Sequence, residues 1–166
     1  MPHISFSELK NWNTCPWYHK LVNIEKLKIF QGNAYTAFGT AMHTVCEEKL
    51  LNEAINEVET FELAFLEELK KLPKEVIEEL DHKLIEGMRA AGKQISPKII
   101  PALNKYFPQG YEVLKTEEDL MEKIINHEGY MFKGFVDLVV KTSDNKVHII
   151  DWKTCSWGWD TRRRSE

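Results

Sequence analysis

Two short apolar segments, separated by a polar turn, most constrain how this chain can fold. Residues 134–140 and 147–154 are rich in β-branched and aromatic side chains, and the polar residues 141–146 lie between them. This pattern predicts a β-hairpin. Each segment carries an acid where an apolar residue is expected, Asp137 in the first and Asp151 in the second.

The predicted hairpin brings these two acids together. If the turn is centred on Asp144, Asp137 and Asp151 lie directly opposite each other, with Cβ atoms roughly 5 Å apart. Two like charges in this position are destabilising unless a cation lies between them. Lys153 follows Asp151 by two residues and therefore shares its face of the strand. The acids and the lysine predict a site for a divalent metal and a phosphate.

The chemistry of this site favours Mg²⁺ or Mn²⁺. Such a cation takes one or two carboxylates and fills its remaining positions with water and phosphate oxygens. The backbone carbonyl of Trp152 lies between Asp151 and Lys153 and offers one more oxygen, and Lys153 would hold or deprotonate the hydrolytic water. The alternative is an edge-strand acid pair with Lys153 as an ordinary salt-bridge partner. We favour the metal site because acids that interrupt apolar segments need compensation.

Composition places the chain among ordinary globular proteins. With 166 residues, of which 43% are hydrophobic and 29% charged, it is most simply one domain over residues 1–166. No run of about 18 apolar residues and no signal-peptide pattern is present, so we expect a cytoplasmic protein without a membrane partner. The net charge of −4 argues against a general nucleic-acid coat, but an acidic metal site can coexist with local basic patches.

Residues 1–108 have the pattern of a mostly helical part. Ser5 and Glu8 form a capping box that starts a helix, and Pro16 marks the start of a second one. For the bulky residues Trp12, Trp17 and Tyr18, we favour core or near-surface packing over base stacking. Helical periodicity predicts four further helices over residues 34–55, 57–71, 74–92 and 95–107.

One of these predicted helices carries Gly39 and His43, which lie four residues apart on one face. A glycine inside a helix costs about 1 kcal/mol relative to alanine, so we expect a close packing partner there. On residue type alone, His43 is an ordinary partly buried histidine more often than a metal ligand.

After residue 108 the pattern changes to strands. Residues 111–154 predict a small, mainly antiparallel meander of three strands that holds the acid and lysine site, so the fold class is α+β. Residues 155–166 form a basic tail with no apolar helix to cover the second face of the sheet. We therefore expect a C-terminally truncated domain, the N-terminal part of a longer protein.

The ordered motifs resemble those of a known family. Asp137 in Gly-x-x-Asp and Asp151-x-Lys153 across a hairpin resemble the PD-(D/E)xK nuclease signature. Gly39-x-x-x-His43 resembles a motif of the RecB-like and CRISPR-associated adaptation exonuclease branch, as does the N-terminal segment with its Cys15-Pro16 step. The resemblance implies a restriction-endonuclease-like core and a metal-dependent deoxyribonuclease that uses Mg²⁺ or Mn²⁺.

The resemblance also implies roles for single residues. Asp137 and Asp151 would be metal ligands, His43 an additional ligand, and Lys153 the residue that positions the hydrolytic water. Members often carry a further acid on the first strand. The best match is Glu117, with Glu112 or Glu118 as alternatives and a solvent-facing acid as the competing interpretation.

Two departures from the family pattern affect these expectations. A helix with Gln-x-x-x-Tyr normally follows the lysine, and no such motif follows Lys153. Some relatives hold an iron–sulfur cluster with three C-terminal cysteines, whereas this chain has only Cys155 there in addition to Cys15, so we expect no cluster. Cys46, on the helix of His43, is expected to be a small core residue.

The function implied is that of an exonuclease acting in recombination, repair or phage DNA processing. In the tail, DNA would be held through phosphate contacts and stacking by Arg162, Arg163, Arg164 and Trp157, unless the tail is simply disordered. An alternative is an inactive nuclease fold that binds DNA or a protein, with a second copy covering the open sheet as a homodimer. A weaker alternative is a helical adaptor with a superficial acid pair.

Overall fold

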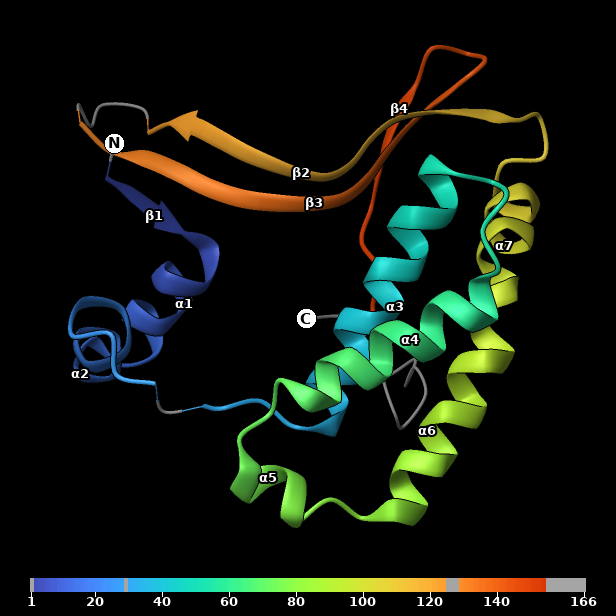
Figure 1. Cartoon of the computed structure of the whole chain (residues 1–166). Coiled ribbons are helices and arrows are strands. Elements are labelled where there is room, and N and C mark those ends of the chain that lie inside the picture. Colours follow the sequence, from blue (N-terminus) through green and yellow to red (C-terminus); the bar gives the residue numbers. More distant parts are fainter. Residues whose placement is uncertain (1, 29, 125–128, 155–166) are drawn as a thin grey trace, which may run out of the picture.

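The protein combines a small N-terminal lobe, a helical body and one sheet (Figure 1). The computed structural model describes residues 2–28, 30–124 and 129–154. The expected DNA contacts of Trp157 and of residues 162–164 lie outside these residues and stay predictions. No helix in the described part is both long and apolar enough to cross a membrane.

The N-terminal lobe begins with the predicted Ser5 N-cap, although the Glu8 carboxylate pairs with His19 Nε2 at 3.0 Å instead of completing a capping box. It consists of strand β1 (His3–Ser5), helix α1 (Phe6–Thr14), helix α2 (Pro16–His19) and the short π-helix η1 (Lys20–Ile24). The Ser5 hydroxyl accepts a hydrogen bond from the Glu8 backbone N–H at 3.2 Å, and Pro16 opens α2. Figure 1 shows the lobe standing apart from the helical body at the far end of the sheet.

In this lobe the aromatic residues pack near the surface rather than in a core, with Trp12 edge-on to His19 and Lys20 over the ring of Trp17. Trp12 and Tyr18 are exposed, and Trp17 is 64% exposed. The lobe contains helices of at most nine residues, and none of its residues is fully buried. Elements this short provide too little surface to enclose a tryptophan.

The helical body follows the predicted order with shifted boundaries. Its elements are α3 (Ala34–Leu51), α4 (Glu57–Lys70), α5 (Lys74–Glu78), α6 (His82–Ile95), the 3-10 helix η2 (Ser96–Lys98) and α7 (Ile99–Tyr106). A single helix over residues 74–92 is wrong, because the Asp81 carboxylate accepts a 2.8 Å hydrogen bond from the Lys83 N–H and starts a new helix. The helix of His43 ends at Leu51 rather than at residue 55.

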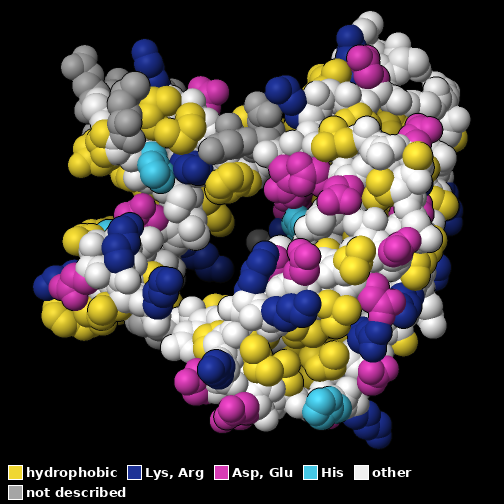
Figure 2. All heavy atoms as spheres, viewed as in Figure 1, with side chains coloured by type: hydrophobic (Ala, Val, Ile, Leu, Met, Phe, Trp, Pro, Cys, Tyr) yellow, Lys and Arg dark blue, Asp and Glu magenta, His cyan; other side chains and the backbone are white. Residues whose placement is uncertain are grey.

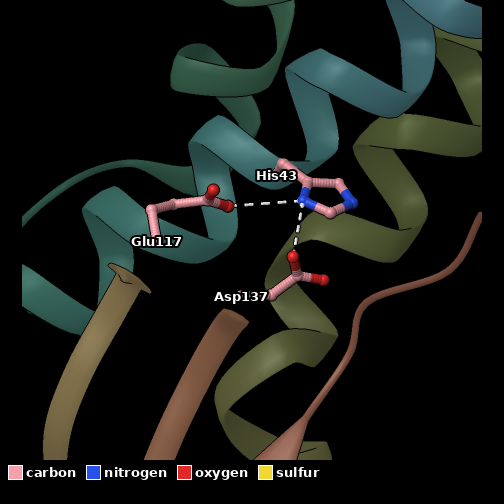
Figure 3. A group of neighbouring side chains, drawn as sticks. All are labelled: His43, Glu117 and Asp137. Carbon is pink, nitrogen blue, oxygen red and sulfur yellow. Dashed lines mark hydrogen bonds and ion pairs between the residues drawn. The ribbon is translucent and has the colours of Figure 1, made fainter. Parts of the chain in front are cut away.

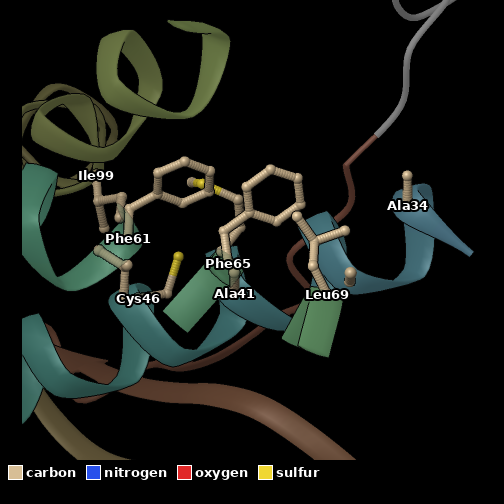
Figure 4. Packing of buried hydrophobic residues seen from close by; sticks show 10 residues of the cluster. Ala34, Ala41, Cys46, Phe61, Phe65, Leu69 and Ile99 are labelled. Atoms are coloured by element: carbon tan, nitrogen blue, oxygen red, sulfur yellow. The ribbon is translucent and has the colours of Figure 1, made fainter. Parts of the chain in front are cut away.

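The main core lies between α3, α4 and α6 (Figure 4). Phe61 and Phe65 are fully buried and stack with ring centroids 5.6 Å apart. A Cβ atom built on Gly92 of α6 would lie 2.0 Å from Phe61 Cζ, so only glycine lets α6 approach this ring. This packing holds α3 in a fixed position beside the sheet.

The sheet is mixed rather than purely antiparallel. Strands β2 (Tyr111–Lys123), β3 (Met131–Thr142) and β4 (Val147–Ile150) form the predicted antiparallel meander, with Leu138 opposite Ile150. In addition, β1 pairs in parallel with β3. The buried side chains of Leu138 and Val140 pack against Leu103 and Phe107, at and just beyond the end of α7, in a second core cluster.

Strand β4 is shorter than the sequence pattern predicts. The expected strand reaches residue 154, whereas the ladder ends at Ile150. The next backbone groups bond elsewhere: the Trp152 N–H donates to the Asp137 carboxylate, and the Trp152 carbonyl faces His43. Side-chain partners therefore replace the ladder from this point.

Candidate metal centre

Three side chains from three elements converge beside the sheet (Figure 3). The Nδ1 atom of His43 on α3 lies 3.4 Å from Oε1 of Glu117 on β2 and 3.8 Å from Oδ1 of Asp137 on β3. One ligand atom from each of the three residues lies within 4.8 Å of the others. The Asp137 side chain is 11% exposed, so its charge is largely removed from water.

The strand register accounts for the pairing of the two acids. Thr116 lies opposite Leu138 and Glu118 opposite Val136, which leaves Glu117 facing Asp137 across β2 and β3. Opposed carboxylates repel each other unless a cation or a proton lies between them. The repulsion is therefore built into the sheet itself.

Glu117 also has an unusual backbone conformation. Its φ angle is 47°, in the left-handed region that side chains other than glycine, asparagine and aspartate rarely adopt. Such strain costs on the order of 1–3 kcal/mol and persists only where the surrounding structure enforces it. Here it occurs at the residue whose carboxylate reaches His43.

The Gly39 and His43 face of α3 receives the chain that leaves β4. A Cβ atom built on Gly39 would lie 3.4 Å from the Thr154 hydroxyl oxygen, which confirms the expected close packing at this glycine. One turn later, His43 Nε2 lies 3.1 Å from the Trp152 carbonyl oxygen. Gly39 and His43 therefore contact the same segment: Gly39 leaves space for Thr154, and His43 contacts the Trp152 carbonyl.

Trp152 fixes both His43 and Asp137 through its backbone. Its N–H donates a 2.6 Å hydrogen bond to Asp137 Oδ2, while its carbonyl faces His43. The indole packs against both core clusters, which anchors this peptide between the helical body and the sheet.

Both ring nitrogens of His43 face oxygen atoms. Nδ1 faces the two carboxylates and Nε2 faces the Trp152 carbonyl. Carboxylate and carbonyl oxygens only accept hydrogen bonds, so a ring nitrogen that carries a proton donates to the oxygen that it faces.

The structure does not bring Asp151 and Lys153 into this group. Their side chains are 60% and 57% exposed, and Lys153 Nζ lies 2.5 Å from Asp151 Oδ1. The β3–β4 ladder ends at the pair Leu138 and Ile150, and its register would place Asp151 opposite Asp137 if it continued by one residue. The role of the two residues in catalysis stays a prediction.

Among the three candidate acids on β2, the structure brings Glu117 to His43. Glu112 is exposed and lies opposite Lys141, far along the strand. The β2–β3 register distinguishes Glu117 from Glu112 and Glu118, because it places Glu117 directly opposite Asp137. A β-bulge between Val113 and Lys115 shifts this register by one residue and hides the pairing in the sequence.

Cys46 lies on α3 together with His43, and burial, together with the negative charges of the centre, raises the pKa of its thiol. Burial raises the pKa of its thiol to about 12, and the negative charges of Asp137 and Glu117 add to this effect. The thiol is buried in the main core cluster, which confirms the expected core role.

The donor set fits a divalent cation. It comprises one imidazole and two carboxylates, whose nitrogen and oxygen atoms are common ligands of divalent metals. The opposed carboxylates provide a charge that the cation would neutralise. The expected ligand carbonyl of Trp152 lies 3.1 Å from the other ring nitrogen of His43, Nε2, and so is not part of this group.

An α+β fold with an acid and histidine group beside its sheet is compatible with a nuclease. Residues 3–163 match the sequence model of the PD-(D/E)XK nuclease superfamily, and the chain belongs to this superfamily. This match confirms the resemblance to the PD-(D/E)xK superfamily and the restriction-endonuclease-like fold class, while the RecB-like branch stays a prediction. It also identifies DNA as the substrate class and divalent metals as the usual cofactors. No curated protein matches the chain.

Proposed function

We propose that the chain is a Mg²⁺- or Mn²⁺-dependent exonuclease that removes nucleotides from DNA ends in recombination, repair or phage DNA processing. The observation that carries this proposal is the convergence of His43, Glu117 and Asp137 at a position where the sheet opposes two carboxylates. The RecB-like order of the motifs in the sequence supports the exonuclease assignment.

In this proposal His43, Glu117 and Asp137 would hold the cation at the Nδ1 side of the imidazole, while the Trp152 carbonyl faces Nε2 and fixes the ring. Asp151 joins them as a further ligand, which the extended β3–β4 register supports. A bound divalent cation supplies Lewis-acid stabilisation of the charge that develops on the phosphate. Lys153 leaves its ion pair with Asp151 and orients the attacking water. Hydrolysis joins the water oxygen to phosphorus, breaks the phosphorus–oxygen bond to the leaving nucleotide, and transfers a water proton to the leaving oxygen.

The test compares cleavage of linear single- and double-stranded DNA by the wild type, Asp137→Asn and Lys153→Ala, with Mg²⁺ or Mn²⁺. We expect each substitution to lower the cleavage rate roughly 100-fold or more, as for the removal of a group that handles protons or the cation. Lys146→Ala is the matched control, because Lys146 is also exposed and pairs with an acid two residues away, Asp144, at 2.6 Å. Cleavage that is independent of metal, or equal in all variants, would exclude this function.

One observation favours a second candidate, a nuclease fold that binds DNA or a protein without cutting. Asp151 and Lys153 pair with each other in solvent instead of joining the three converging residues. A second copy would then cover the exposed residues Val147 and Ile149 of β4. Inert wild-type protein that retards DNA in a gel and sediments as a dimer would support this candidate over the enzyme.

A further inference from the structure

Phe135 is an exposed aromatic residue in the middle of the strand that carries Asp137. Its side chain is 64% exposed although β3 pairs with three other strands of the sheet. The ammonium group of Lys133 lies 4.8 Å from the centre of its ring, within the range of a cation–π contact. The sheet thus presents a flat apolar surface with a positive charge attached to it.

This aromatic pair lies close to the metal centre. Side chains two residues apart on a strand point to the same side, so Lys133, Phe135 and Asp137 follow one another along one face of β3. The rise of about 3.4 Å per residue separates Phe135 from Asp137 by roughly 7 Å along the strand. A nucleotide whose phosphate is held at Asp137 can therefore place a neighbouring base at Phe135.

The adjoining edge of β3 is open in the described part of the chain. On this edge β1 pairs with residues 131–133 and β4 with residues 138–141, so residues 134–137 lie between the two partner strands. A Cβ atom built on Gly134 would meet no atom within 4 Å. Figure 2 shows the opening between the N-terminal lobe and the helical body, with acidic side chains and a histidine at its margin.

We propose that Phe135, supported by Lys133, is a base-stacking platform that makes the centre select single-stranded DNA ends. The proposal rests on the proposed function for its substrate, DNA. An aromatic ring binds the face of a base only after that base has left the duplex stack, whereas a lysine contributes a phosphate contact to any DNA. An aromatic ring with an adjacent cation is the combination that binds single strands without sequence preference.

The test measures affinity for a single-stranded oligonucleotide and for a blunt duplex of the same sequence, without divalent metal so that no cleavage interferes. We expect Phe135→Ala to bind the single strand about tenfold more weakly, equivalent to about 1.4 kcal/mol, and the duplex with unchanged affinity. Phe135→Trp restores binding because it retains a stacking surface. A 2-aminopurine base near the end of the oligonucleotide should be quenched by the wild type and not by Phe135→Ala.

Phe30→Ala is the matched control, because Phe30 has the same side chain and the same exposed fraction, 64%, in the segment before α3. It should leave both affinities unchanged. An equal loss on single strand and duplex, failure of Phe135→Trp to restore binding, or an equal loss in Phe30→Ala would each overturn the platform, as would a protein partner that buries Phe135.

The same variants separate this inference from the proposed function. A wild-type protein that cuts no DNA but whose single-strand affinity depends on Phe135 contradicts the nuclease and retains the platform. A protein that cuts DNA with metal, and whose strand preference is the same in Phe135→Ala, retains the nuclease and contradicts the platform.

Discussion

The backbone N–H of Trp152 donates a 2.6 Å hydrogen bond to the Asp137 carboxylate, at the point where β4 leaves the sheet. The Trp152 N–H bonds to a side chain instead of to a backbone carbonyl of the neighbouring strand. The bond orients Asp137 toward His43. The Trp152 carbonyl faces the same histidine. A single peptide therefore links the end of the hairpin to two of the three converging side chains.

The Trp152 side chain should matter for the centre through its position between the two cores. We expect Trp152→Ala to lower the free energy of unfolding by about 3 kcal/mol, the usual cost of removing a large aromatic from a core. It should also weaken Mn²⁺ binding, because the Trp152 peptide loses its anchor. Urea unfolding and Mn²⁺ titration measure the two effects.

Trp152→Phe is the control for this prediction. The indole Nε1–H is buried and has no hydrogen-bond partner among the described residues, so its removal relieves a desolvation cost. Phenylalanine should retain Mn²⁺ affinity and most of the stability. Equal loss of metal affinity in both variants would show that the packing of Trp152 does not position the site.

The strained backbone of Glu117 predicts an unusual order of stabilities. In metal-free protein, Glu117→Gly should be more stable than Glu117→Ala by about 1 kcal/mol, because glycine adopts a φ of 47° without the steric cost that a Cβ atom imposes. Both variants remove the same charge, so their difference isolates the backbone. Chemical denaturation measures it, and an alanine variant of equal or greater stability would contradict the strain.

Cys46 provides a pH-dependent test of the charged surroundings. Burial raises the pKa of its thiol from the ordinary value of 9.0 to about 12 in the folded protein, so the unfolded chain loses this proton first. The contribution of the protonated Cys46 thiol to the free energy of unfolding is fully present below pH 9 and is lost as the pH rises toward 12. At pH 10 the loss is about 1.4 kcal/mol. The difference in unfolding free energy between wild type and Cys46→Ala should shift by this amount between pH 8 and pH 10. A constant difference would contradict the raised pKa.

Local sequence signals predicted the parts of the fold that depend on neighbouring residues. Ser5 caps α1 as its capping pattern indicates, and the hairpin register follows from the position of its polar turn. Gly39 in a helix interior predicted a close contact, and Thr154 makes this contact. For the cap and the hairpin the signal and its physical cause lie within a few residues, whereas Gly39 indicated a contact without identifying its distant partner.

Features that depend on residues far away in the sequence could not be predicted from local patterns. Strand β1 has three residues and exists only because it pairs in parallel with Met131 to Lys133. The end of β4 at Ile150 is set by His43 and Asp137, and the conformation of Glu117 by the strand opposite it. Tertiary contacts override local preference at each of these positions.

The most direct test of the metal centre compares Mn²⁺ binding by Glu117→Gln and Glu112→Gln. Calorimetry or electron paramagnetic resonance measures the binding. Both acids lie on β2, but only Glu117 faces His43 and Asp137. We predict that Glu117→Gln binds Mn²⁺ at least tenfold more weakly than the wild type, roughly the effect of losing one tuned contact of a metal site. Glu112→Gln should bind it with unchanged affinity. Equal Mn²⁺ affinities for the wild type and Glu117→Gln would contradict the centre.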